Sequence, residues 1–259
     1  MTSLLVPEQS IIDIHERIQL SVVIPVYNQQ SNISSSLSRI KQILDSALIQ
    51  YELVLVNDGS QDDTLKILKN EERVDSRIRV ISYTPNMGKG FAVKTGVVQS
   101  RGDIIIFTDG DLDISPDVIA NYIKELTDFD MVIASKRHPL SVVDAPLSRK
   151  ILSRAFNLVV QIGTGIKIED TQAGLKAGKG DVLRKIFSVM VVKRYAFDVE
   201  LLAIATLLRL QIKELPVTIH LDRRFKIKDI MRMFVDVLGI SYRYRIKRWY
   251  QERINLVNQ

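Results

Sequence analysis

The 259-residue sequence contains no cysteine, only three histidines and a single tryptophan. The missing thiols exclude disulfides, zinc sites built on thiolates and cysteine nucleophiles. The histidines, His15, His138 and His220, are too far apart in the sequence to show metal-ligand spacing. The absence of cysteine is also compatible with a reducing compartment.

Long hydrophobic runs are missing as well. No apolar run approaches the roughly 18–20 residues that a helix needs to cross a bilayer, and the densest stretch, LLAIATLL from Leu201, has the size of a core helix. The first residues, MTSLLVPEQSIIDIHERIQ, lack the basic start and apolar block of a secretory signal. We therefore expect a cytoplasmic protein without a transmembrane segment, either soluble or peripheral on the cytoplasmic face of a membrane.

The composition is that of an ordinary globular protein with an excess of positive charge. Hydrophobic residues make up 46% of the chain and charged residues 25%, and the formal net charge is +6. Such an excess attracts nucleic acid, anionic lipid or phosphorylated small molecules. Between Arg223 and Arg253 we count ten Lys/Arg against three Asp/Glu, so the C-terminal end carries most of the excess.

Runs rich in Val, Ile and Leu alternate with helix-like segments in the first half of the chain. The runs predict strands over 21–28, 51–60, 77–84, 103–111 and 130–137. Helices are expected over 31–48, 62–72, 86–100 and 116–126. This order predicts an α/β fold with a mostly parallel central sheet and helices on both faces. The polar motifs that follow the strands would then share the ligand-binding edge of the sheet.

The rhythm changes after residue 138. The pattern predicts a basic helix over 146–163, a polar segment over 168–178, helices over 181–190 and 194–210, and one strand over 211–222. We find no Gly/Ser/Pro-rich linker and no strong internal repeat. A single domain with a C-terminal elaboration is the simplest interpretation.

Three aspartates alternate along FTDGDLDISP, at the end of the apolar run IIIF: Asp109, Asp111 and Asp113. Carboxylates this close raise each other's pKa, and a bound cation removes that conflict. Mg²⁺ and Mn²⁺ take one or two carboxylates together with substrate phosphates. We therefore interpret Asp109 and Asp111 as ligands of a divalent metal. Asp113 either supports that site or caps the helix that begins near Pro116.

Two further polar motifs follow strands. Asp58 in VNDGSQDDT can accept hydrogen bonds from a ribose or a base edge, or it forms an Asx turn that caps a helix. In NMGKG, two glycines and Lys89 precede a helix, a combination that favours phosphate. The spacing matches neither a Walker A loop nor a dinucleotide-binding GxGxxG motif. A turn permitted by glycine, with a solvated lysine, is the alternative.

Taken in this order and at these spacings, VIPVYN, NDGSQDD, NMGKG and TDGDLD resemble the nucleotide-binding half of family 2 glycosyltransferases with the GT-A fold. Downstream, SKR, EDTQAGLK and RYAFDVELL resemble members of that family that act on polyprenyl phosphates, dolichyl-phosphate β-glucosyltransferases among them. The resemblance implies a GT-A domain over 1–259. Its parts would be a nucleotide-sugar-binding half (19–138), an acceptor-binding half (139–222) and a basic amphipathic C-terminal region (223–259).

The resemblance also implies roles for residues on the donor side. The nucleoside would be bound by Pro25, Tyr27, Asn28 and Asp58, with Lys89 near the nucleotide. Asp109 and Asp111 would hold Mg²⁺ or Mn²⁺ on the donor diphosphate, Asp111 thereby counting as catalytic. Two positions depart from the family pattern: Gln29 stands where an acid is frequent, and Gly110 where alanine is frequent.

On the acceptor side the resemblance implies that Arg137 and Arg149 attract the lipid phosphate. Asp170 and Gln172 would face the donor sugar and the reacting centre, with Asp170 orienting groups there and not acting as an obligatory base. Asp198 and Glu200 would begin a helix that closes the site.

The implied reaction is inverting transfer of a hexose, with glucose from UDP-glucose preferred, to a polyprenyl or dolichyl phosphate. The second pKa of such a phosphate is about 6, so the acceptor is already anionic near neutral pH and needs little help from a general base. A family 2 transferase acting on a sugar hydroxyl in polysaccharide or glycan assembly is the alternative. Nucleic acid is not expected as a partner, because strand-end acids would repel its phosphates.

The C-terminal stretch interleaves apolar and basic residues, a pattern that suits an interfacial helix on anionic lipid. Its apolar band comprises Phe225, Ile227, Ile230, Met231, Met233, Phe234, Val237 and Leu238. We therefore expect peripheral contact with an anionic membrane surface. The alternatives are packing on the core with a solvated basic side, or an interface between copies of the chain; the oligomeric state is left open.

Overall fold

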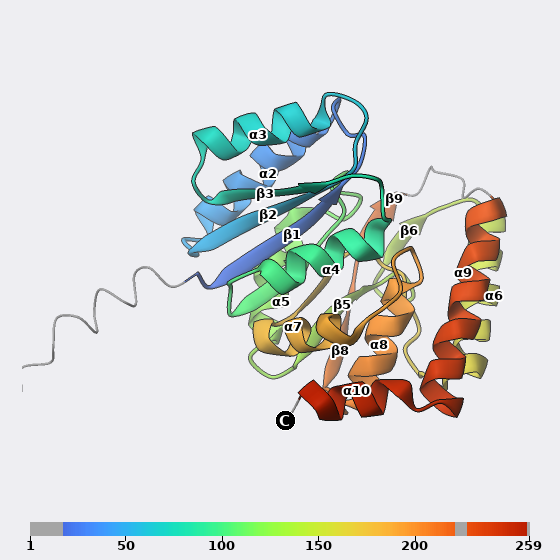
Figure 1. Ribbon diagram of the computed structural model, residues 1–259. Coiled ribbons are helices and arrows are strands. Elements are labelled where there is room, and N and C mark those ends of the chain that lie inside the picture. Colours follow the sequence, from blue (N-terminus) through green and yellow to red (C-terminus); the bar gives the residue numbers. More distant parts are fainter. Residues whose placement is uncertain (1–17, 221–226, 258–259) are drawn as a thin grey trace, which may run out of the picture.

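The structure, a computed structural model, describes residues 18–220 and 227–257 and is built around a seven-stranded sheet in the order β3-β2-β1-β4-β7-β5-β8 (Figure 1). The strands are β1 (Leu20–Val26), β2 (Tyr51–Asp58), β3 (Ile78–Tyr83), β4 (Ile104–Phe107), β5 (Met131–Ser135), β7 (Lys176–Lys179) and β8 (Ile212–Pro216). A second, two-stranded sheet pairs β6 (Val142–Asp144) with β9 (Thr218–His220). The predicted α/β architecture with a mostly parallel sheet is confirmed.

Two details of the sheet differ from the sequence prediction. The segment read as polar contains β7, which runs antiparallel between β4 and β5. The single strand expected over 211–222 is two strands in different sheets, because β8 ends at Pro216, which has no N–H to donate to a ladder. Strands from the second half of the chain thus complete the sheet of the first half, and the two proposed halves share one sheet.

Helices cover both faces of the sheet because successive strand residues point to opposite sides. On β1, Val22 and Ile24 pack in one layer and Val23 in the other. The layer of Val22 contains residues of α2 (Ile33–Ser46), α3 (Thr64–Val74) and α5 (Ile119–Glu125). The layer of Val23 contains residues of α4 (Lys89–Gln99), α7 (Gly180–Val189) and α8 (Phe197–Leu207).

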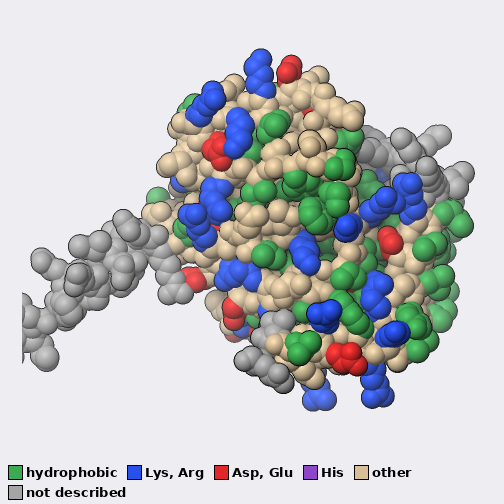
Figure 2. All heavy atoms as spheres, viewed as in Figure 1, with side chains coloured by type: hydrophobic (Ala, Val, Ile, Leu, Met, Phe, Trp, Pro, Cys, Tyr) green, Lys and Arg blue, Asp and Glu red, His purple; other side chains and the backbone are tan. Residues whose placement is uncertain are grey.

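The remaining helices lie against the layer of Val23. They are α6 (Leu147–Thr164), α9 (Ile227–Ser241), the π-helix η2 (Tyr242–Ile246) and α10 (Trp249–Val257). In the predicted apolar band, Met233 and Val237 are core residues, whereas Met231 and Leu238 are exposed. Hydrophobic side chains accordingly remain on the outer side of α9 (Figure 2). Phe225 lies outside the described residues, as do 223–224, 226 and 258–259 of the C-terminal region.

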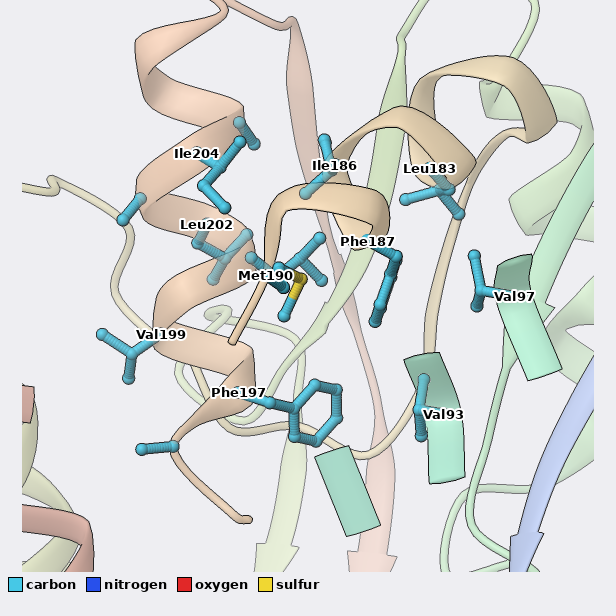
Figure 3. Packing of buried hydrophobic residues seen from close by; sticks show 14 of the residues in the cluster. Val93, Val97, Leu183, Ile186, Phe187, Met190, Phe197, Val199, Leu202 and Ile204 are labelled. Carbon is cyan, nitrogen blue, oxygen red and sulfur yellow. The ribbon is translucent and has the colours of Figure 1, made fainter. Parts of the chain in front are cut away.

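Helix α8 is buried on almost every side, which makes it the centre of this layer. Figure 3 shows Phe187 of α7 and Phe197 of α8 in this layer, together with Met190. Phe107 at the end of β4 makes an edge-to-face contact with Phe187, with ring centroids 5.7 Å apart. The end of β4, which leads into the strand-end acids, is therefore held in a packed aromatic layer.

The helix near Pro116 begins with a short 3-10 turn, η1 (Pro116–Val118), that continues into α5. Its N-cap is Ser115, whose hydroxyl accepts from the N–H of Asp117. The alternative in which Asp113 caps this helix is therefore wrong. In the described part of the chain, none of the helices combines the length and the apolar character that crossing a membrane requires.

Candidate active site

A pocket of about 1400 Å³ opens at the carboxyl ends of the parallel strands. Eleven of the predicted site residues line it: Pro25, Tyr27, Asp58, Lys89, Asp109, Asp111, Asp113, Arg137, Arg149, Gln172 and Asp198. Three do not: Asn28, Asp170 and Glu200. The structure therefore brings together side chains that the sequence separates by up to about 170 positions. It buries Asp170 and Glu200 away from the pocket surface, whereas Asn28 is exposed but does not line the pocket.

Asp109 follows β4 and forms an ion pair with Lys89, the first residue of α4, at 2.5 Å. Burial alone would lower the pKa of Lys89, but the carboxylates of Asp109 and Asp198 hold it above its ordinary value. Lys89 is therefore a fixed positive charge at this end of the pocket. It lies where the sequence motif NMGKG predicts a contact with phosphate.

The oxygen donors at this end suit a hard divalent cation that is completed by a ligand. Within residues 18–220 and 227–257, no group of three or more acidic or histidine side chains could hold a metal ion by itself. Asp109 and Asp111 nevertheless line the same pocket. Mg²⁺ is commonly held by one or two carboxylates, with substrate phosphates and water as the other ligands. This pair of carboxylates fits such a cation.

The backbone approaches Asp109 and the neighbouring Gln29 side chain closely. A Cβ on Gly174 would collide with the Asp109 carboxylate, and one on Gly110 would collide with the side-chain oxygen of Gln29. The two departures from the family pattern, Gln29 and Gly110, are thus in contact. The Gln29 side chain occupies the space that an alanine Cβ at 110 would need.

The side chains of Asp58 and Asn28 accept hydrogen bonds from the backbone of neighbouring loops. The carboxylate of Asp58 accepts hydrogen bonds from the N–H groups of Met87 (2.7 Å) and Gly88 (2.9 Å), which fixes the NMGKG loop beside the pocket. Asn28, with a φ of 51°, accepts from the N–H of Gln61. Asp58 still lines the pocket, whereas the described contacts of Asn28 are to a neighbouring loop.

Beneath the pocket lies a fully buried ion pair. Lys176 of β7 donates to Asp198 of α8 at 2.6 Å, and its side chain has no solvent exposure. Burial lowers the pKa of Lys176 and raises that of Asp198, and each partner opposes the shift in the other. Because Asp198 lines the pocket and also acts on Lys89, the Lys176 ammonium supports the charges around Lys89 and Asp109 from behind.

Asp170 is buried behind Lys136. It accepts from the Lys136 N–H at 2.7 Å and from its ammonium group, and also from the N–H of Gln172 at 3.1 Å. Burial alone would raise the pKa of Asp170, but Lys136 holds it below its ordinary value of 3.8. Asp170 therefore positions Lys136 and Gln172, both of which line the pocket.

This arrangement predicts a pH-dependent contribution of Asp170 to stability. A folded-state pKa below the unfolded value stabilises the fold above about pH 4, and the contribution is lost as the pH falls through the folded pKa. We expect Asp170→Asn to lower the free energy of unfolding by about 2 kcal/mol near neutral pH. Urea denaturation at about pH 7 and about pH 3 should show this difference narrowing in acid. The exposed Asp128→Asn is the control, and a difference that does not change with pH would contradict the assignment.

Basic side chains also line the pocket, several of them from the first half of α6. Arg137 donates to the carbonyl of Ser153, and burial lowers the pKa of Arg149 while Asp113 opposes that shift. Both arginines retain their charge near neutral pH. Sequence reasoning missed five further basic residues that line the pocket: Lys136, Lys150, Arg154, Arg194 and Arg232. Their signal was weak: Lys136 only neighbours Arg137, and Lys150 and Arg154 share the basic first half of one helix.

Glu200 is an anchor and not a pocket residue. Its carboxylate accepts from the N–H groups of Val191 and Val192 and from the hydroxyl of Tyr250 on α10. Burial raises the pKa of Glu200, and these donors oppose that shift. Glu200 thus ties the loop before α8 to the C-terminal helix.

Sequence comparison identifies the family. The profile of "Glycosyl transferase family 2" matches residues 21–187. This range includes the acids that follow the strands and the basic residues of α6 that line the pocket. This chain belongs to glycosyl transferase family 2. The motifs that suggested the family line its pocket.

Two relatives in this family are similar over most of the chain. A Dictyostelium discoideum protein named dolichyl-phosphate beta-glucosyltransferase is 31% identical over 254 residues, which cover 90% of this chain and 77% of the relative. A Homo sapiens protein of the same name is 31% identical over 259 residues, covering 93% and 80%.

Solved structures support the fold. Glucosyl-3-phosphoglycerate synthase from Mycobacterium tuberculosis, in complex with Mn²⁺, UDP and glucosyl-3-phosphoglycerate, superposes with a TM-score of 0.65 at 20% identity. The match covers 88% of this chain and 80% of that chain. This family 2 transferase therefore has the GT-A fold.

Proposed function

We propose that this protein is an inverting transferase that moves glucose from UDP-glucose to dolichyl phosphate or a related polyprenyl phosphate. One observation carries the proposal: strand-end carboxylates and a cluster of arginine and lysine line one pocket. That arrangement suits a metal-bound diphosphate and a second, anionic substrate. The names of the relatives give the donor sugar and the acceptor, and a complex of the synthase contains Mn²⁺ and UDP-glucose.

On the donor side, Asp109 and Asp111 would hold a Mg²⁺ or Mn²⁺ ion against the diphosphate. When bound, that ion supplies positive charge that stabilises the departing nucleoside diphosphate. Lys89 adds a fixed positive charge beside it. Pro25, Tyr27 and Asp58 would enclose the nucleoside, because they line the pocket at the ends of β1 and β2.

On the acceptor side, Arg137 and Arg149 would bind the lipid phosphate, with Lys136 held in place by Asp170. The phosphate is already anionic, so positioning it behind the anomeric carbon is the main task. A single displacement from that side inverts the carbon. Residues 19–138 would thus supply donor contacts and, through Lys136 and Arg137, part of the acceptor contacts, and 139–222 would supply the other acceptor contacts, Arg149 among them. Peripheral binding to an anionic membrane would present the lipid.

The direct test is product formation from a panel of UDP- and GDP-sugars with dolichyl phosphate, with and without Mg²⁺ or Mn²⁺. We expect glucosyl transfer from UDP-glucose that depends on the metal and gives the β product. Calorimetric titration of the same sugar nucleotides with Mn²⁺ separates donor binding from turnover. Transfer to a sugar hydroxyl, and none to a polyprenyl phosphate, would show that the sugar-hydroxyl alternative is correct.

Arg149→Ala should weaken binding of the acceptor and leave binding of the donor unaffected. Losing one charged hydrogen bond to phosphate costs about 1.5–3 kcal/mol, so we expect the KM for the polyprenyl phosphate to rise about tenfold to a hundredfold. The KM for the sugar nucleotide should change little. Arg73→Ala, at an exposed position on α3, is the control. If only the KM for the sugar nucleotide rises, Arg149 acts on the donor and its assignment to the acceptor is wrong.

A further inference from the structure

Exposed hydrophobic side chains are concentrated on two neighbouring helices and the turn that follows them. Nine of the eighteen exposed large hydrophobic residues in the described part of the chain belong to α6, α9 and η2. They are Leu147, Ile151, Leu158, Ile162, Met231, Val235, Leu238, Tyr242 and Ile246. Figure 2 shows hydrophobic side chains along this side of the molecule, where α6 and α9 lie in Figure 1. Patches of this kind mark interaction sites.

These residues form one continuous surface. On α6 they follow intervals of four, seven and four residues, and on α9 and η2 intervals of four, three, four and four, so each set is one helical stripe. The two helices run in the same direction. The rings of Phe156 and Phe234 make an edge-to-face contact with centroids 5.6 Å apart, and about two turns farther along both helices, Gly163 lies against Ser241. The two helices therefore lie side by side, and we call the surface formed by their exposed stripes the α6–α9 face.

The α6–α9 face is joined to the pocket and flanked by positive charge. Leu152 and Phe156 of α6 line the pocket together with Ile230 and Met233 of α9, so the same two helices carry both features. Helix α6 has three basic residues, Arg149, Lys150 and Arg154, and no acidic one. At the other end of the face, the Arg245 side chain lies next to Gly165.

We propose that the α6–α9 face seats the protein on an anionic lipid membrane, with the pocket at the level of the headgroups. The inference rests on the proposed function, because a polyprenyl chain stays in the bilayer while its phosphate must reach the pocket. Apolar side chains enter the acyl boundary and neighbouring basic side chains meet anionic headgroups. A second copy of the chain fits this surface less well, because a two-fold contact would bring the basic residues of both copies together.

The test compares two sets of serine substitutions at exposed apolar positions. The first is Leu158→Ser, Ile162→Ser and Leu238→Ser, at side chains that are 56%, 68% and 65% exposed and do not line the pocket. The control is Leu48→Ser with Val74→Ser, which are 92% and 86% exposed and far from the face in the sequence. Co-sedimentation uses vesicles of phosphatidylcholine alone and of phosphatidylcholine with phosphatidylserine.

We expect the triple variant to bind the mixed vesicles about tenfold more weakly or worse, because apolar area no longer enters the bilayer. The control should bind like the parent, and the parent should prefer the mixed vesicles. Turnover of a short-chain polyprenyl phosphate dissolved in water should be unchanged in the triple variant. Vesicle binding that survives the triple substitution would overturn the inference.

Two further outcomes are assigned in advance. If the parent is a dimer by light scattering, binds no vesicles and becomes a monomer in the triple variant, the face joins two copies of the chain and the inference is overturned. If the parent binds vesicles through this face but transfers no sugar to either acceptor, the proposed function fails. The inference that the α6–α9 face binds the membrane would then still hold, because vesicle binding is measured without any substrate.

Discussion

Asp111→Ala should lower the turnover number by about a hundredfold to a thousandfold at saturating metal and donor. The proposed role of Asp111 is to fix a cation on the diphosphate as negative charge develops on the leaving group. Removing one preorganised electrostatic contact of this kind typically costs that much in rate. The measurement is initial velocity with UDP-glucose and polyprenyl phosphate over a range of Mn²⁺ concentrations. Calorimetric titration with Mn²⁺ and UDP should show a parallel loss of metal binding.

Asp113→Ala is the matched control, because it removes a carboxylate from the same loop and the same pocket. Asp113 lies farther along the loop, is exposed and does not cap the next helix. We expect its turnover to fall by no more than about tenfold, mainly through the lost charge opposite Arg149. Equal losses for the two variants, or near-normal turnover of Asp111→Ala, would refute the assignment of Asp111 to the metal.

Lys176→Met should lower the free energy of unfolding by about 3–5 kcal/mol, because it leaves the Asp198 carboxylate buried without its ammonium partner. Urea denaturation followed by circular dichroism measures the change. Lys179→Met on the same strand is the control: its ion pair with Asp130 is partly exposed, and we expect a loss of no more than about 1 kcal/mol.

The double variant Lys176→Met with Asp198→Asn separates charge from packing. Without the uncompensated carboxylate, it should recover about half or more of the lost stability. It should not recover normal donor binding, because Asp198 lines the pocket and acts on Lys89. If the double variant is no more stable than Lys176→Met, the loss comes from packing around the side chain and not from the unpaired charge.

Short-range patterns in the sequence predicted much of the fold. Periodic apolar residues predicted the helices over α2, α3, α4, α6 and α7 and the strands β1 to β5, because these elements bury faces that show in their own sequence. β7 was missed because its four residues, KAGK, carry no strand signature, and only its neighbours β4 and β5 make it a strand. The C-terminal band was assigned to one surface, although Met233 and Val237 face the core while Met231 and Leu238 face outward.

The sequence by itself determined the alternation of strands and helices, the strand-end position of the acids and the family resemblance, since these depend on neighbouring residues and fixed spacings. Only the tertiary structure decided which polar groups meet. It placed Asp170 behind Lys136 and Glu200 beneath α10, and it paired Lys176 with Asp198 across 22 positions. It also set the apolar stripes of α6 and α9 side by side. Burial and long-range pairing depend on how layers pack, and a linear pattern does not contain that information.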